Sequence, residues 1–341
     1  GKIFIMGDVA GACSLIALDA AAGKQVWTAR IGKAGECGSY AGPRGTPSVD
    51  GGLVFALGQF GDLVCVQAAT GQAVWHKSLT TDFKGGVPGW GYAESPLVDG
   101  PLLVCTPGGR QAAIVALNKT TGVPVWQCSE FKDGAHYSSP IMAEIGGIRQ
   151  YIQLTAERVA GVAANNGKLL WQAARQGKTA VVTTPVYADN EVFVTSAYGV
   201  GHNAFKITAA GGQFSAEQLY SGKEIENHHG GVVLVGGHLY GHSDHGGWTC
   251  MEFKTGKVVW QNGGVGKGSV TCADGRLYTR SENPKGTVAL VEATPGGYKE
   301  SGRFDQPGRS KLNSWPHPVV CGGKLYLRDQ DILLCYNVKA P

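Results

Sequence analysis

The sequence carries little charge, and it does not concentrate charge of either sign. Only 16% of its 341 residues are Asp, Glu, Lys or Arg, and the formal net charge is +4. No run of Lys and Arg is longer than two residues. Because domains that bind nucleic acid usually present a clustered basic surface, the composition argues against a nucleic-acid partner.

Long apolar runs are also missing. No apolar stretch approaches the eighteen residues that a membrane-spanning helix needs, so we expect no membrane span. Neither a signal peptide nor a lipid-attachment cysteine is visible, although a leader that had been removed would leave no trace.

The nine cysteines lack every spacing that binds metal or haem. There is no CxxC, no CxxCH and no adjacent pair, which argues against thiolate metal clusters and c-type haem. Most cysteines lie in apolar strand patterns such as LVCVQ, LLVCT and LLCYN, where we expect buried small hydrophobic side chains. Cys13 and Cys37, which we expect in loops, could pair in a disulfide.

What the sequence does have is glycine and apolar residues. It contains 53 Gly, and 43% of its residues are hydrophobic. This combination predicts many short strands joined by tight turns, and the length suits one large all-β domain or two ordinary domains.

A repeat of the form AxxxTGxxxW organises the chain. Each copy predicts a strand, a turn that ends in Gly, and a second strand that carries Trp. The tryptophans of the clear copies are Trp27, Trp75, Trp126, Trp171 and Trp260. Degenerate copies carry Phe214 and Tyr298 at the aromatic position.

A second motif alternates with the first and predicts two short strands around a DG, DN or GG turn. Together the motifs make a unit of four strands, A to D, in about 45 residues, which is typical of a β-propeller blade. The count predicts an all-β, eight-bladed β-propeller that forms one domain over residues 1–341. The first blade lacks strand A and the last lacks its Trp strand, so we expect a longer natural N-terminus to supply closing strands.

The repeated signature resembles that of the PQQ-repeat β-propellers, which include quinoprotein alcohol dehydrogenases and the outer-membrane assembly lipoprotein BamB. The segments GPRGTP, WGYAESPLVDG, YSSP and WPHPVV are similar to those of a secreted, planctomycete-type group of PQQ-like proteins. The resemblance implies that the repeated Trp wedges between neighbouring blades. It also implies a periplasmic or extracellular protein, which we expect to be a monomer.

The loops that carry chemistry should share one face of the blades. In an up-and-down meander the D–A loops and B–C turns lie on one side, and here they are the longer and more varied connections. Strand A is innermost, so residues before it should ring a central funnel. The predicted ligand-binding funnel comprises Arg44, Glu94, Tyr137, His228, His229, Lys267, Trp315, His317 and Arg328. The B–C turns also bring Asp62, Arg110, Arg158, Tyr198, His202, Asp244, His245, Glu282, Asp329 and Asp331 to this face.

Such a rim suits a polar or anionic small molecule, with Arg and Lys as donors and an aromatic stacking surface. The alternative is that strand ends are polar only because they meet water.

The segment 227–248 contains five of the nine histidines. His228 and His229 should begin a strand A, and adjacent strand residues point to opposite faces, so both cannot easily bind one ion. His238 should lie near the opposite face. The possible ligands of a divalent transition metal are His229, His242, Asp244 and His245. The alternative role for these side chains is hydrogen bonding to a ligand or to neighbouring loops.

Three functions remain open. The resemblance to quinoprotein dehydrogenases implies PQQ with Ca²⁺ and an Asp base, for which the candidates are Arg44, Glu94, Arg328, Asp329 and Trp315. The missing vicinal cysteine pair, the shorter chain and the missing haem motif depart from that pattern. The second function is a binding or assembly protein that holds a small polar molecule, a glycan or a protein segment. The third is a propeller-fold carbohydrate-active lyase that uses Tyr, His and Arg for proton abstraction.

Overall fold

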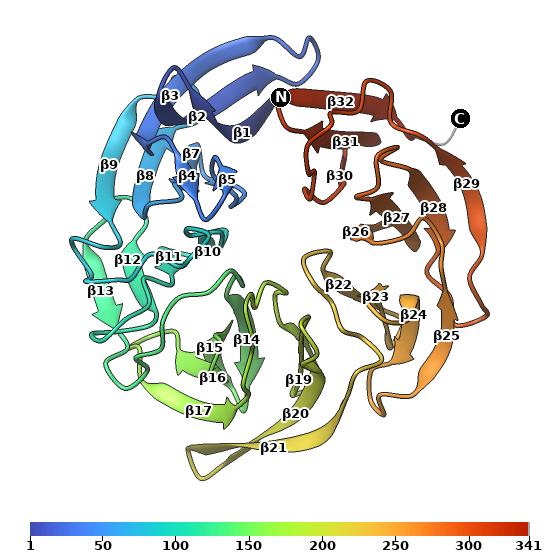
Figure 1. The fold of residues 1–341 in the computed structure, drawn as a ribbon. Coiled ribbons are helices and arrows are strands. Elements are labelled where there is room, and N and C mark those ends of the chain that lie inside the picture. Colours follow the sequence, from blue (N-terminus) through green and yellow to red (C-terminus); the bar gives the residue numbers. More distant parts are fainter. Residues whose placement is uncertain (340–341) are drawn as a thin grey trace. The chain divides into compact units, whose positions relative to one another are not determined.

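The computed structural model describes residues 1–339, and every regular element in that part of the chain is a β-strand. Within these residues there is accordingly no helix with the length and apolarity to cross a membrane. Eight antiparallel sheets follow one another along the sequence, and each is formed by consecutive strands (Figure 1). This is an eight-bladed β-propeller, so the predicted fold class is confirmed.

The blades at the two ends of the chain have three strands each, as the repeat predicts. The first consists of β1 (Lys2–Val9), β2 (Ala12–Asp19) and β3 (Gln25–Lys33), followed by the small hairpin of β4 (Glu36–Cys37) and β5 (Tyr40–Ala41). The last consists of β30 (Val319–Cys321), β31 (Lys324–Asp329) and β32 (Ile332–Asn337).

Six blades of four strands lie between them in the sequence. The first three are β6 (Ser48–Asp50), β7 (Leu53–Leu57), β8 (Asp62–Gln67) and β9 (Ala73–Ser78); β10 (Leu97–Asp99), β11 (Leu102–Cys105), β12 (Val115–Asn118) and β13 (Pro124–Gln127); and β14 (Ile141–Ile145), β15 (Ile148–Leu154), β16 (Arg158–Ala163) and β17 (Leu169–Ala174). The next three are β18 (Val186–Ala188), β19 (Glu191–Ser196), β20 (Gly201–Ala210) and β21 (Gln213–Gly222); β22 (Val232–Val235), β23 (His238–Ser243), β24 (Gly247–Glu252) and β25 (Val258–Asn262); and β26 (Gly268–Ala273), β27 (Arg276–Ser281), β28 (Val288–Glu292) and β29 (Glu300–Phe304).

The strands group into two compact units. The first comprises residues 1–177 and 207–216, and the second comprises residues 178–206 and 217–341. Within the second unit, β22, β26 and β30, which are the first strands of successive sheets, lie side by side. The connections that lead into these strands therefore come together, and they carry the site described below.

Tight turns with positive φ fix the register of the hairpins. Gly51 and Gly52 have φ of 54° and 85°, and Gly236 and Gly237 have 55° and 78°. Two successive positive φ values match the type I′ turn, whose twist agrees with that of the strands. These turns set the alternation that buries Val54 and its counterparts in each blade.

The repeated Trp connects each blade to the next one in the sequence. Trp75 donates its indole N–H to the carbonyl of Lys119 at 2.9 Å, and Trp126 donates to Ala164 at 2.9 Å. A Cβ on Gly122, whose φ is 70°, would lie 2.7 Å from the ring of Trp75. The Gly of the TG turn is therefore needed both for the positive φ and for the close packing of the Trp ring. These contacts confirm the predicted wedge for these blades.

Two aromatic assignments need correction. Trp171 donates its indole N–H to Gln150 of its own sheet, so its hydrogen bond differs from those of Trp75 and Trp126. In the fifth blade the wedge is Tyr220 and not Phe214, because the Tyr220 hydroxyl donates to the carbonyl of Phe253 in the following blade. Strands β20 and β21 are longer than the corresponding strands of the other blades, so the wedge residue Tyr220 lies further along the sequence than the repeat predicts.

The seventh blade has no aromatic wedge at the expected register. Gly302 faces Leu290 there, where Trp260 faces Cys250 in the blade before. Tyr298 precedes β29 and packs its ring against Trp260 at a centroid distance of 5.8 Å. Tyr298 therefore supports the preceding Trp and does not replace it.

The cysteines are free thiols, and the possible Cys13–Cys37 disulfide is absent. Both residues lie in strands and not in loops. Cys65 and Cys105 are buried as predicted, but Cys335 is exposed because its strand β32 is the outer strand of the last blade.

Candidate functional site

The two adjacent histidines lie in a loop that Asn227 holds. Asn227 is buried, and its side-chain oxygen accepts from the hydroxyl of Thr183 at 2.8 Å and from the amide of Gly231 at 3.0 Å. Its side-chain nitrogen donates to the carbonyl of His242 at 2.9 Å. All its hydrogen-bonding atoms are therefore used to fix the backbone that carries His228 and His229.

This loop overturns the expectation that His228 and His229 point to opposite faces. Strand β22 begins only at Val232, so the alternation of strand residues does not apply to the histidines. Their rings lie together, with centroids 4.7 Å apart, and both line one cavity of about 450 Å³.

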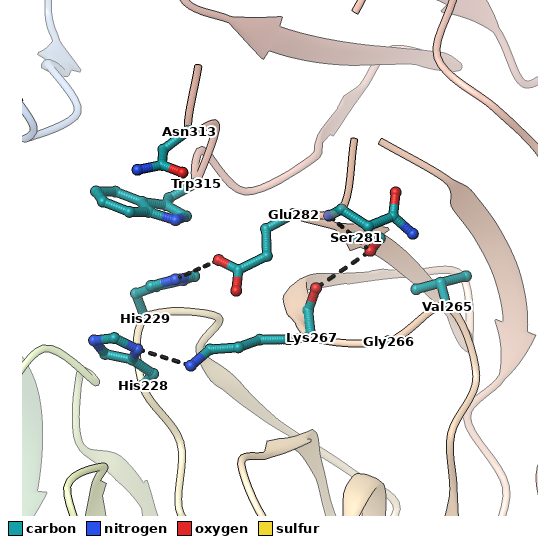
Figure 2. A pocket seen from close by; sticks show the side chains of 10 residues that line it. His228, His229, Val265, Gly266, Lys267, Ser281, Glu282, Asn313 and Trp315 are labelled. Carbon is teal, nitrogen blue, oxygen red and sulfur yellow. Dashed lines mark hydrogen bonds and ion pairs between the residues drawn. The ribbon is translucent and has the colours of Figure 1, made fainter. Parts of the chain in front are cut away.

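The cavity lies within the second unit, between loops of three successive blades (Figure 2). The loop before β22 contributes both histidines, and the loop before β26 contributes Lys267. The turn after β27 contributes Glu282, and the loop before β30 contributes Trp315. In this unit the D–A loops and B–C turns do converge, as the sequence predicts.

His228 is held in one protonation state by its neighbours. The Lys267 ammonium lies 2.9 Å from Nδ1, and an ammonium can only donate, so Nδ1 must be the acceptor. The proton then sits on Nε2, which lies 2.8 Å from the Tyr198 hydroxyl. Burial, together with the charges of His229 and Lys267, lowers the pKa of His228 to about 4. His228 is therefore a neutral imidazole at physiological pH.

Lys267 and Tyr198 are themselves fixed in position. Lys267 forms an ion pair with Asp244 at 2.8 Å. Tyr198 has a φ of 64°, which is uncommon for a bulky residue, and the neighbouring Gly199 amide donates to the buried carboxylate of Glu226. From this backbone conformation the Tyr198 hydroxyl reaches His228, although Tyr198 itself does not line the cavity.

His229 and Glu282 form a second polar pair. Nε2 of His229 lies 2.9 Å from Glu282, while Nδ1 of His229 is buried and has no hydrogen-bond partner among residues 1–339. Burial would raise the pKa of Glu282, but the hydrogen bond and charge of His229, the charge of Lys267 and a hydrogen bond from Trp315 lower it below its ordinary value. Glu282 is therefore a carboxylate at neutral pH, and Figure 2 shows it pointing toward His229.

Trp315 lies over His229, with ring centroids 5.2 Å apart (Figure 2). His317 supports the same loop because its Nε2 donates to the backbone carbonyl of His229 at 2.9 Å. Arg328 donates through Nε to the carbonyl of Gln330 at 3.0 Å. The structure thus brings His228, His229, Lys267 and Trp315 of the predicted funnel into one cavity, whereas His317 and Arg328 contact the backbone.

The three funnel residues of the first unit make structural contacts there. Arg44 donates to the carbonyls of Gly42 and Tyr40 at 3.0 and 2.8 Å. Glu94 is buried and accepts from the backbone of Thr106, and Tyr137 is buried and accepts from the backbone of Trp90. Sequence position alone does not show that a residue before strand A already bonds nearby backbone groups.

The four predicted metal ligands have separate partners. Asp244 pairs with Lys267, His245 lies 3.3 Å from Glu226, and His242 is buried with its ring edge against Trp248. Across the described residues, no group of three or more His, Cys, Asp or Glu side chains could hold a metal ion. The arrangement therefore does not support the metal set. His238 opens β23 beside Gly236, at the other end of the strand, as expected.

Arg44, Glu94 and Asp329, three of the five residues that the resemblance implied for PQQ and Ca²⁺, do not fit such a site. Asp329 is fully buried, and its carboxylate accepts from Arg309 Nη1 at 2.7 Å and from the amide and hydroxyl of Ser310 at 2.6 and 2.7 Å. Arg44 and Glu94 bond backbone groups, as described above. An Asp used in this way cannot also bind a metal ion or take up a proton without breaking the network.

The predicted funnel omitted Glu282, together with Ser281, Asn283 and Asn313, which also line the cavity. The place of Glu282 in a B–C turn was visible in the sequence, but its pairing with His229 depends on contact between successive blades. The sequence also did not predict the structural role of Asn227. It lies between Glu226 and the two histidines, and no known motif marks an Asn in that position.

Comparisons with known proteins agree with this fold. The family model PQQ_2, described as outer membrane protein assembly factor BamB, matches residues 12–262. Tetrathionate hydrolase from Acidithiobacillus ferrooxidans is 26% identical over 244 residues, which are 67% of this chain and 40% of that protein. The chain therefore spans less than half the length of this curated relative.

Solved structures extend the similarity over nearly the whole chain. BamB from Moraxella catarrhalis has a TM-score of 0.68 and 15% identity, covering 98% of this chain and 95% of that one. The computationally designed Ika8 protein has a TM-score of 0.67 and 11% identity, covering 99% and 94%. Quinohemoprotein alcohol dehydrogenase from Comamonas testosteroni has a TM-score of 0.61 and 11% identity, covering 96% and 68%. At these identities the likeness concerns the fold alone, and function must be argued from the site.

Proposed function

Because the chain belongs to the PQQ-repeat family of the outer membrane protein assembly factor BamB, we propose that it is a binding propeller of the periplasm or cell exterior. Its site is the cavity of the second unit, which binds a polar small molecule, a glycan or a protein segment. The observation that carries the proposal is the convergence of Lys267, Glu282 and Trp315 on one cavity of about 450 Å³. Binding sites commonly combine a concave surface with a few convergent polar groups.

The polar groups of the cavity are preorganised. Lys267 is held by Asp244 and His228, and Glu282 is held by His229. A ligand that binds them does not need to order these side chains, which reduces the entropic cost of binding. This arrangement favours a binding site over a merely polar surface.

The direct test is a ligand screen with matched variants. The probes are neutral sugars, sugar acids, amino acids and short peptides, and isothermal titration calorimetry measures the affinity. We expect one class to bind, and Lys267→Ala and Glu282→Ala to weaken its binding about tenfold or more, because hydrogen bonds to charged groups contribute about 1.5–3 kcal/mol. Lys299→Ala, an exposed lysine of the same unit, is the control. Binding that the cavity variants leave unchanged, or the absence of binding, would refute the proposal.

A second candidate function is hydrolysis of tetrathionate, which the name of the curated relative suggests. The charge of the cavity speaks against it, because a dianion needs a surplus of cationic donors and Lys267 is already paired with Asp244. We expect no turnover when the protein is incubated with tetrathionate and the remaining substrate is measured. Turnover that Lys267→Ala abolishes would establish this candidate instead.

The proposal excludes quinone catalysis at the predicted residues. Reconstitution with PQQ and Ca²⁺, followed by a dye-linked assay with alcohols and sugars, should give no oxidation. The proposed location is tested by fractionating cells that express the full natural protein, which should leave it outside the cytoplasm.

A further inference from the structure

We infer that the ligand of this cavity is a neutral saccharide that presents neighbouring hydroxyl groups, and not an anion. The inference rests on the proposed binding role of the cavity and adds the chemical class of the ligand. It differs from the expectation drawn from the sequence, in which Arg and Lys donors suited an anionic molecule.

The first argument is charge. The charged side chains in and beside the cavity are the Lys267 ammonium and the Glu282 carboxylate, which line it, and the Asp244 carboxylate, which pairs with Lys267. His228 contributes no charge, because Lys267 occupies its Nδ1. The formal charge of these side chains is therefore minus one. An anion would meet no surplus of positive charge, and it would compete with Asp244 for the ammonium.

A strongly cationic ligand is disfavoured as well. The Lys267 ammonium and the Glu282 carboxylate both line the cavity, so a cation attracted to Glu282 would also meet the like charge of Lys267. Like charges in contact cost several kcal/mol at an interface. A neutral ligand with hydroxyl groups avoids both penalties.

The second argument is the supply of donors and acceptors. An ammonium has three N–H donors, and within the described chain Lys267 uses two of them, on Asp244 and His228. A carboxylate has about four acceptor positions, and Glu282 pairs with His229 through one oxygen, Oε2. Figure 2 shows the Glu282 carboxylate and the Lys267 side chain bordering the same space. One hydroxyl of a vicinal diol can donate to Glu282 while its neighbour accepts from Lys267.

The third argument is the aromatic wall. Trp315 lines the cavity, and its ring packs against the ring of His229. An indole ring is a large, rigid apolar surface with one polar edge. The C–H face of a pyranose ring matches such a surface while its hydroxyl groups remain available to Glu282 and Lys267.

The test compares saccharides that differ only in charge. The probes are neutral cello-, malto- and xylo-oligosaccharides, together with uronic-acid oligosaccharides of the same length, and calorimetry measures their affinities. We expect a neutral oligosaccharide to bind and the uronic acids to bind about tenfold or more weakly, since each factor of ten is about 1.4 kcal/mol.

Variants connect the binding to the cavity. Trp315→Ala and Glu282→Gln should each weaken binding of the neutral oligosaccharide about tenfold, while Trp315→Phe should retain most of it. Glu300→Gln, which alters an ion pair with Arg303 away from the cavity, is the matched control. Thermal unfolding confirms that each variant is folded.

The outcomes separate the inference from the proposed function. Preferential binding of a uronic acid that Lys267→Ala abolishes would overturn the inference and leave the proposed function standing. Saccharide binding that is equal in wild type and Trp315→Ala would overturn the inference as well. If no probe of either class binds and the broader ligand screen is also negative, both fail.

Discussion

Replacing Glu94 by Gln should make the stability of the protein less dependent on pH. The Glu94 side chain is buried in the first unit, where Oε1 accepts from the amide of Thr106 at 2.6 Å. Its other oxygen, Oε2, has no hydrogen-bond partner among residues 1–339. Burial therefore raises the pKa of Glu94 from 4.5 to about 7, and the hydrogen bond from the Thr106 amide offsets this only in part.

The sign of the effect follows from proton linkage. Between pH 4.5 and pH 7 the folded protein keeps a proton on Glu94 that the unfolded chain has already lost. The contribution of Glu94 to the free energy of unfolding is therefore largest below pH 4.5, and it is lost as the pH rises through 7. At about 1.4 kcal/mol for each pKa unit, this single carboxyl destabilises the folded state by about 3 kcal/mol at pH 8 relative to pH 4.

The assay is urea unfolding of wild type and Glu94→Gln at pH values from 4 to 8. The amide keeps the shape of the side chain but does not ionise, so the variant should gain about 3 kcal/mol over wild type at pH 8 compared with pH 4. Glu144→Gln, an exposed residue of the same unit, controls for general charge effects. If the difference between Glu94→Gln and wild type is the same at both pH values, the reasoning about Glu94 is wrong.

Three further predictions concern stability and protonation. Asp329→Asn should lower the free energy of unfolding by about 3–5 kcal/mol because it breaks a buried ion pair, whereas exposed Asp331→Asn should change it little; equal effects in denaturant unfolding would contradict this. Trp126→Ala should cost about 3–5 kcal/mol, because the ring is buried and bonds the next blade; a thermal unfolding midpoint close to wild type would contradict the wedge. The His228 ring should titrate by NMR near pH 4 with its proton on Nε2, and Lys267→Met should raise this pKa, since it removes a positive charge and the donor to Nδ1; an unchanged midpoint would contradict the assignment.

The blades could be predicted because their determinants are local. The TG turn before each Trp and the DG or GG turn between the first two strands depend on residues within one blade. Gly122, for example, must be Gly because of its φ and because the ring of Trp75 leaves no room for a Cβ. Such constraints recur with the repeat, so the sequence alone predicts eight antiparallel sheets.

The site could be predicted only in part because its contacts lie between blades. The position of Lys267 before a strand A was visible, but its pairing with His228 depends on how two successive loops approach each other. The predicted orientation of His229 was wrong, because Asn227 holds a loop at the position where a strand was expected. Asp329 was a plausible base from its position, yet a buried network of distant residues occupies its carboxylate.

The measurement that tests the account most directly is the NMR signal of the Trp315 indole N–H during ligand titration, assigned with Trp315→Phe. Trp315 lines the cavity and packs against His229, so ligand binding there should shift this signal while that of Trp260, which donates to Thr294 between blades, stays in place. A ligand that binds with measurable affinity and leaves the Trp315 signal unchanged would contradict the assignment of this cavity as the binding site.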